Sequence, residues 1–125
     1  MRNCIGISFC VFAFTSFWSC AYHVEDILYP PDTCDTTNVT YSGTILPIIE
    51  QFCYDCHSNA NVGVSQIPLE GYDFLIVKVN DGKLIKAIRH SDPANVSPMP
   101  KDRSALEECN IEKIEKWVSQ GAPNN

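Results

Sequence analysis

A five-residue motif near the middle of the chain, Cys53-Tyr54-Asp55-Cys56-His57, constrains the fold more than any other feature. On one turn of a helix, the two thiols can reach both vinyl groups of a single porphyrin, and the histidine can then bind the iron. The sequence therefore predicts one covalently attached haem c. The helix that carries the motif must bring apolar side chains that help to enclose the ring.

Paired cysteines also occur in redox enzymes and in zinc sites, and both remain alternatives. A dithiol–disulfide oxidoreductase would use Cys53 and Cys56 as its redox pair. Such a motif usually opens a helix after a strand, and no strand pattern precedes this one. A zinc-stapled binding module would need four ligands, and Cys53, Cys56 and His57 are too crowded to supply three of them.

The amino-terminal segment has the features of an export signal. A short basic start precedes an apolar run over residues 4–18, which is shorter than the roughly 20 residues of a membrane-spanning helix. We expect residues 1–19 to be removed and Cys20 to carry a lipid, as in a periplasmic or membrane-anchored bacterial lipoprotein. Phe17 and Trp18 depart from the usual lipoprotein processing sequence. Ordinary cleavage to a soluble periplasmic protein and a retained anchor are therefore the alternatives.

The rest of the chain is long enough for one domain and not two. Residues 20–40 contain Pro30 and Pro31 and several polar, turn-forming residues, so we interpret them as a tether to a haem domain over residues 41–125. The chain has 15 acidic and 9 basic side chains. Nucleic acid is therefore not expected as a partner.

Apolar residues recur at helical spacing through the domain, which predicts an all-α fold. We expect a first helix that begins with Thr44 as its N-cap and runs into the motif. Two short helices are expected over residues 72–80 and 82–90, and a last helix over 111–120 with Asn110 as its N-cap. The apolar stripe of the first helix consists of Ile45, Ile48, Ile49, Phe52 and Cys56.

A methionine between two prolines is the second strong feature. Met99 lies in a polar loop between Pro98 and Pro100, and it is the only methionine outside the predicted signal. The prolines restrict the backbone to extended conformations, so the thioether loses little entropy when it is held in place. We predict Met99 as the second axial ligand of the iron. The rival sixth ligand is His90, at a predicted helix end.

The segment after the motif is expected to support the histidine. An axial histidine usually donates its other ring proton to a backbone carbonyl, which fixes the tautomer. Pro68 lies eleven residues after His57 and keeps its carbonyl, so we predict it as the acceptor. Leu69 is expected to pack on the porphyrin.

Together these motifs resemble a single-haem class I cytochrome c domain of the bacterial type. The likeness covers residues 41–123 and consists of C-x-x-C-H, a Met-Pro loop and a last helix with the pattern W-x-x-x-G-A. It implies three to five short helices around one haem, with the first and last helices crossing at one haem edge. His57 and Met99 would be the axial ligands.

The resemblance also implies a function. Cys53 and Cys56 would anchor the haem through thioethers, and the protein would transfer single electrons rather than act as an enzyme. A haem-based sensor or binder of small ligands, with Met99 displaceable, is the alternative.

Basic residues gather around the methionine loop, although the chain is acidic overall. We expect this side to rim the exposed haem edge and to meet an acidic patch on a redox partner. A merely solvated charged surface is the alternative. The residues concerned are Lys83, Lys86, Arg89, Lys101 and Arg103.

Two cysteines have no role in the signal, the lipid site or haem attachment, namely Cys34 and Cys109. In an exported protein an even remainder of cysteines is best interpreted as a pair. In the cytochrome c fold that the chain resembles, the first and last helices cross, so these two positions would approach each other. We expect a disulfide that fastens the tether to the domain, with two free thiols as the alternative.

Overall fold

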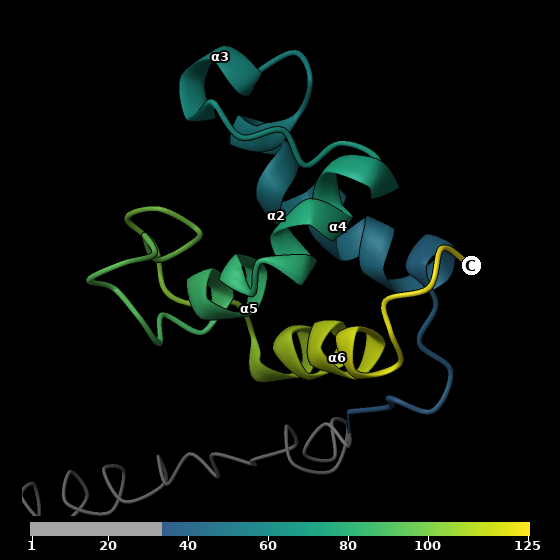
Figure 1. The fold of residues 1–125 in the computed structure, drawn as a ribbon. Helices are drawn as coiled ribbons and strands as arrows, with labels where there is room; N and C mark the ends of the chain where they lie inside the picture. Colours follow the sequence, from purple (N-terminus) through teal and green to yellow (C-terminus); the bar gives the residue numbers. More distant parts are fainter. Residues whose placement is uncertain (1–33) are drawn as a thin grey trace, which may run out of the picture. The chain divides into compact units, whose positions relative to one another are not determined.

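The computed structural model describes residues 34–125, and these residues form helices joined by loops (Figure 1). No strand occurs among them, so the all-α prediction is confirmed. The elements are the π-helical turn η1 (Tyr41–Ile45) and the α-helices α2 (Leu46–His57), α3 (Val62–Ser65), α4 (Tyr72–Asn80), α5 (Lys83–Ile88) and α6 (Glu108–Ser119). The predicted signal peptide, most of the predicted tether and the predicted lipidation site Cys20 lie outside the described residues.

The first helix begins earlier than predicted. The side-chain oxygen of Thr40 accepts a hydrogen bond from the amide of Gly43 at 3.1 Å, so Thr40 is the N-cap of η1. The amide of Thr44 already donates to the Thr40 carbonyl at 3.1 Å. Thr44 therefore lies inside the helical turn, and its prediction as the N-cap is wrong. Pro47 is tolerated where it lies, in the first turn of α2.

The middle helices lie where the sequence predicts them. α4 matches residues 72–80, and α5 ends two residues before the predicted boundary. Gly82 separates them with a φ of 71°, a left-handed conformation that glycine adopts without steric cost. Leu75, Leu84 and Ile88 are buried and join these helices to the core.

The last helix packs its apolar stripe against η1 and α5 (Figure 1). Ile111, Ile114 and Trp117 are buried. The helix begins at Glu108, and the amide of Asn110 donates to the Glu107 carbonyl at 3.0 Å. The prediction of Asn110 as the N-cap is therefore wrong, because its amide is already engaged in the first turn.

An aromatic cluster around Trp117 closes the core. Tyr41 stacks on the indole with ring centroids 5.9 Å apart, and Tyr72 meets Tyr41 edge to face at 5.2 Å. The buried polar atoms of these rings are satisfied by the carboxy-terminal segment. The indole Nε1 donates to the Pro123 carbonyl at 2.9 Å, and the Tyr72 hydroxyl donates to the Ala122 carbonyl at 2.8 Å.

The end of the predicted tether belongs to the domain. Val39 is 4% exposed within the core, and residues 34–125 form one compact unit. Cys34 and Cys109 form a disulfide with Cα atoms 5.3 Å apart, as the sequence predicted. This bond fastens residues before η1 to the first turn of α6.

No helix within residues 34–125 is both long enough and apolar enough to cross a membrane.

Candidate haem-attachment site

The predicted haem-binding motif occupies the end of α2. Its two thiols are three positions apart on the helix, so they lie on one face. Cys53 is partly buried and Cys56 is exposed, and neither takes part in the disulfide. Covalent haem attachment requires two unpaired thiols at this spacing, which can form thioether bonds to the porphyrin.

His57 is held on two sides by the segment that follows α3. Its ring nitrogen Nδ1 lies 2.8 Å from the carbonyl oxygen of Ile67, and its own carbonyl accepts a hydrogen bond from the amide of Leu69 at 2.9 Å. A carbonyl oxygen can only accept, so Nδ1 donates and the lone pair of the neutral imidazole is on Nε2. This is the tautomer that an iron ligand needs. None of the hydrogen bonds within residues 34–125 engages Nε2.

The acceptor is Ile67, so the prediction of Pro68 is wrong by one residue. In an extended backbone, a carbonyl and the amide two residues later point to the same side. Ile67 and Leu69 therefore both meet His57, while the carbonyl of Pro68 falls on the other side. Leu69 is 6% exposed and belongs to the core. Its contact with a porphyrin stays a prediction.

The loop after the motif is fastened at two further points, one on the segment before α4 and one on α2. The amide of Asn59 donates to the Glu70 carboxylate at 2.6 Å, and the side-chain amide of Asn61 donates to the Asp55 carbonyl at 3.1 Å. The short helix α3 lies in this loop, where the sequence predicted no helix. A helix of four residues is too short for a recurring spacing of apolar residues to be recognised in the sequence.

Large apolar side chains are exposed on the segment after the motif and on α4. Val64 on α3 is 80% exposed, and Ile67, whose carbonyl meets the imidazole, is 37% exposed. Phe74 and Val77 on α4 are also exposed, and their spacing puts them on one helix face. The chemistry of the motif, with two free thiols and an imidazole whose Nε2 makes no hydrogen bond within residues 34–125, fits a covalently attached haem.

The burial of Cys53 does not favour a role for Cys53 and Cys56 as a redox dithiol. Burial raises the pKa of this thiol to about 11. A dithiol oxidoreductase needs the opposite, a cysteine with a lowered pKa that is a thiolate near neutral pH. A zinc module would need further donors, and within residues 34–125 no three His, Cys, Asp or Glu side chains gather to hold a metal ion.

Met99 lies in the long segment between α5 and α6, which extends away from the helices in Figure 1. The residue is partly buried. Its amide donates to the Ala87 carbonyl at 3.0 Å, so its backbone is fastened to the last turn of α5. Its role as an axial ligand stays a prediction.

His90, the rival ligand, is engaged elsewhere. Its Nε2 lies 3.0 Å from the carbonyl oxygen of Met99. The imidazole therefore meets the backbone of the predicted methionine ligand, which the sequence did not suggest. The only sequence signal was the position of a histidine nine residues before Met99.

The predicted basic side is largely paired with acidic residues. Lys83 lies 3.6 Å from Asp81, and Lys86 lies 3.2 Å from Asp92. Arg89 binds the carboxylates of two residues on α6, Glu108 and Glu115. Lys101 and Arg103 are exposed, and no ion pair within residues 34–125 involves them.

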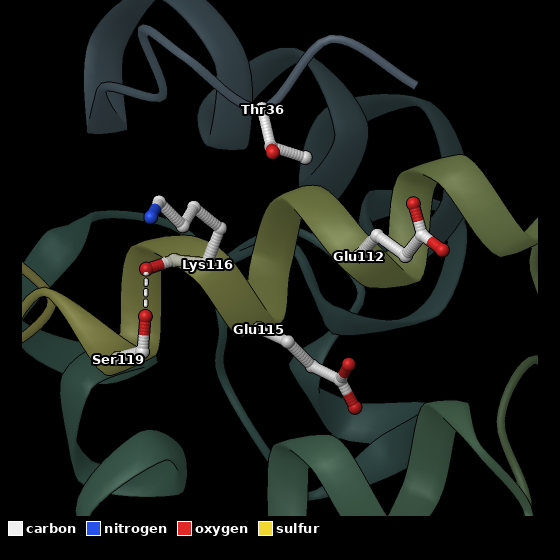
Figure 2. Close-up of a pocket in the computed structure, with 5 residues that line it drawn as sticks. All are labelled: Thr36, Glu112, Glu115, Lys116 and Ser119. Carbon is white, nitrogen blue, oxygen red and sulfur yellow. Dashed lines mark hydrogen bonds between the residues drawn. The ribbon is translucent and has the colours of Figure 1, made fainter. Parts of the chain in front are cut away.

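A hollow of about 380 Å³ lies over the outer face of α6 (Figure 2). In Figure 2, Thr36 approaches α6 from the segment before η1. The hydroxyl of Ser119 donates a hydrogen bond to the carbonyl of Lys116. The hollow is open to solvent, and none of the predicted haem-binding residues lines it. Its lining is formed by Thr36, Glu112, Glu115, Lys116 and Ser119.

Comparisons with protein-family models, with curated proteins and with solved structures found no match to this chain. The inference of a function therefore rests on the candidate haem-binding groups of the chain itself. They are two free thiols on one helix face, and an imidazole whose Nε2 carries the lone pair.

Proposed function

We propose that this protein is a c-type cytochrome that carries single electrons through one covalently bound haem. The observation that supports this most strongly is the hydrogen bond from His57 Nδ1 to the Ile67 carbonyl. It leaves Nε2 as the ligand atom, in the residue that directly follows two free thiols. A histidine held this way is oriented before the iron arrives.

Each residue of the proposed site has one task. Cys53 and Cys56 would hold the porphyrin through thioethers, His57 would ligate the iron through Nε2, and Met99 would ligate it through its own thioether. A bound haem supplies a one-electron Fe(III)/Fe(II) couple, and a thioether ligand raises its potential relative to a second histidine.

The ligand set favours electron transfer over catalysis. With His57 and Met99 both bound in addition to the porphyrin nitrogens, the iron would have no open position for a substrate. A sensor with a displaceable methionine is less well supported, because the backbone of Met99 is fastened by hydrogen bonds on both sides of its Cα.

The cellular setting of the proposal comes from the sequence. Export, removal of residues 1–19 and lipidation of Cys20 would put the domain in the periplasm or at a membrane surface. The partners would then be redox proteins of that compartment. Lys101 and Arg103 are the basic residues best suited to meet an acidic partner, because the other three are engaged in ion pairs.

A redox titration tests the proposed function. The haem-loaded protein should show a low-spin spectrum and a reversible transition with the slope of a one-electron couple, about 59 mV per tenfold change in ratio. The midpoint potential should be positive or near zero. A five-coordinate spectrum, or no reversible one-electron transition, would contradict electron transfer through a His57/Met99 site.

A further inference from the structure

We propose that His90 is a positioning residue that holds Met99 in place as an iron ligand. This inference rests on the proposed function, because it assigns a task to His90 only if Met99 binds haem iron. The observation behind it is the 3.0 Å contact between His90 Nε2 and the Met99 carbonyl oxygen. Since a carbonyl only accepts, the imidazole donates a hydrogen from Nε2.

The second polar group of the Met99 backbone is held by α5, which ends two residues before His90. The Met99 amide donates to the Ala87 carbonyl at 3.0 Å, in the last turn of α5. Pro98 and Pro100 have no amide hydrogen, so Met99 is the one backbone donor within residues 98–100. The two hydrogen bonds to Met99 therefore carry the attachment of this loop tip to α5.

The helix end that supports Met99 is itself firmly anchored. Leu84 and Ile88 of α5 are buried in the core at 5% and 2% exposure. Arg89, next to His90, binds Glu108 and Glu115 on α6. A hydrogen bond from His90 therefore connects the methionine loop to the packed core.

The backbone of His90 also points to a task for its side chain. Its φ is +52°, in the left-handed region where helices commonly end with glycine. A residue with a Cβ is strained there, so glycine would suit the turn better than histidine does. The hydrogen bond to Met99 is a gain that glycine could not provide.

The consequence concerns the bond between iron and the methionine sulfur. Met99 would leave the iron more readily without the His90 hydrogen bond, because the loop would have more freedom. An external ligand such as imidazole competes for the same position. Loss of the net stabilising free energy of one hydrogen bond should increase the affinity for imidazole about two- to tenfold.

Two variants separate the hydrogen bond from the backbone strain. His90→Gly suits the positive φ and folds without strain, but it lacks the donor. His90→Gln keeps an N–H donor at a similar distance from the backbone. Each is prepared as the haem-loaded protein and titrated with imidazole in the ferric state. The charge-transfer band of methionine-ligated ferric haem is recorded in parallel.

We expect the wild type to show the methionine band and a low affinity for imidazole. His90→Gly should weaken the band and bind imidazole about two- to tenfold more tightly, and His90→Gln should restore wild-type values. Unchanged behaviour of His90→Gly, or equal behaviour of both variants, would overturn the positioning role. A wild type without the methionine band would instead contradict the proposed ligand set, so the two failures are distinguishable.

Discussion

The two ring nitrogens of His57 have different roles in the proposed site. Nδ1 donates to the Ile67 carbonyl, and Nε2 keeps its lone pair for the iron. The bond to Ile67 involves a backbone acceptor, so no side-chain substitution at position 67 removes it. Substitutions at position 67 should therefore affect side-chain packing around the His57 imidazole more than they affect its tautomer.

Replacement of Met99 tests the second ligand. Met99→Ala should leave the iron five-coordinate and high-spin, because no other thioether lies in the described part of the chain. The ferrous variant should then bind carbon monoxide, which the wild type should resist. Visible spectra with and without carbon monoxide measure this. Val96→Ala, in the same loop, is the control and should stay low-spin; low-spin spectra for Met99→Ala would contradict Met99 as a ligand.

At the residue scale, the sequence predicts the candidate haem-binding side chains better than it predicts the hydrogen bonds that hold the candidate ligands. The thiols and the histidine follow from the local spacing of the motif, which fixes their chemistry. The choice of Ile67 over Pro68 depends on the direction of an extended backbone, and the bond from His90 to Met99 depends on a loop returning to its helix. Neither is encoded in a local pattern of residue types.

At the scale of elements, a network of charges joins α5 to α6. Arg89 donates from Nε and Nη2 to the carboxylate of Glu115 and also binds Glu108 at 3.0 Å. The pKa of Glu115 is lowered, chiefly by its hydrogen bond from Arg89. The carboxylate therefore contributes to stability when it is ionised.

Glu115→Gln should destabilise the fold by about 0.2 to 1 kcal/mol at neutral pH, since both side chains remain partly exposed to solvent. The contribution is fully present above the ordinary carboxyl pKa of 4.5 and is lost as the pH falls through the lowered value in the fold. Denaturant unfolding at pH 7 and at acidic pH measures both. The matched control is Glu112→Gln, and an equal loss in the two variants would contradict the network.

The helix boundaries show what periodicity can predict. The break between α4 and α5 follows from Asp81-Gly82, which is a strong local turn signal. The prediction of Thr44 as the first N-cap was wrong because Thr40 and Thr44 are both good N-caps by residue type. Only the hydrogen bond to Gly43 distinguishes Thr40 as the cap.

The segment between α5 and α6 carries the charges available to a partner. Reversing both residues, with Lys101→Glu and Arg103→Glu, should slow electron exchange with an anionic probe such as hexacyanoferrate and remove the decrease in rate at rising ionic strength. Stopped-flow rates at low and high salt measure this. Lys83→Glu is the control, because Lys83 is paired with Asp81. Rates that do not change in the double variant would contradict docking on this segment.

At the scale of the whole molecule, the two ends of the described chain are fastened together. The side-chain oxygen of Asn125 accepts from the amide of Tyr41 at 2.8 Å, and its backbone oxygen accepts from Ser42 at 2.8 Å. The disulfide joins Cys34 to Cys109 across 75 residues. The predicted haem-binding motif lies within that loop, so the disulfide-closed loop includes the helix that carries the motif.

Removal of the disulfide should reduce stability without removing the haem. Chain entropy for a loop of this length gives an upper value of about 4 kcal/mol for Cys34→Ala with Cys109→Ala. Denaturant unfolding with and without reductant measures the difference. Reductant should destabilise the wild type and leave the double variant unaffected. Two free thiols in the unfolded, unreduced and haem-loaded wild type would contradict the bond.

The intact mass of the denatured protein, made with a c-type maturation system, tests the central claim most directly. We predict the mass of the processed chain plus one haem, retained after acid extraction because thioethers are covalent. Cys53→Ala with Cys56→Ala should lose that added mass, and the disulfide double variant should keep it. The mass of the bare chain, without haem absorbance, would contradict the assignment of this protein as a c-type cytochrome.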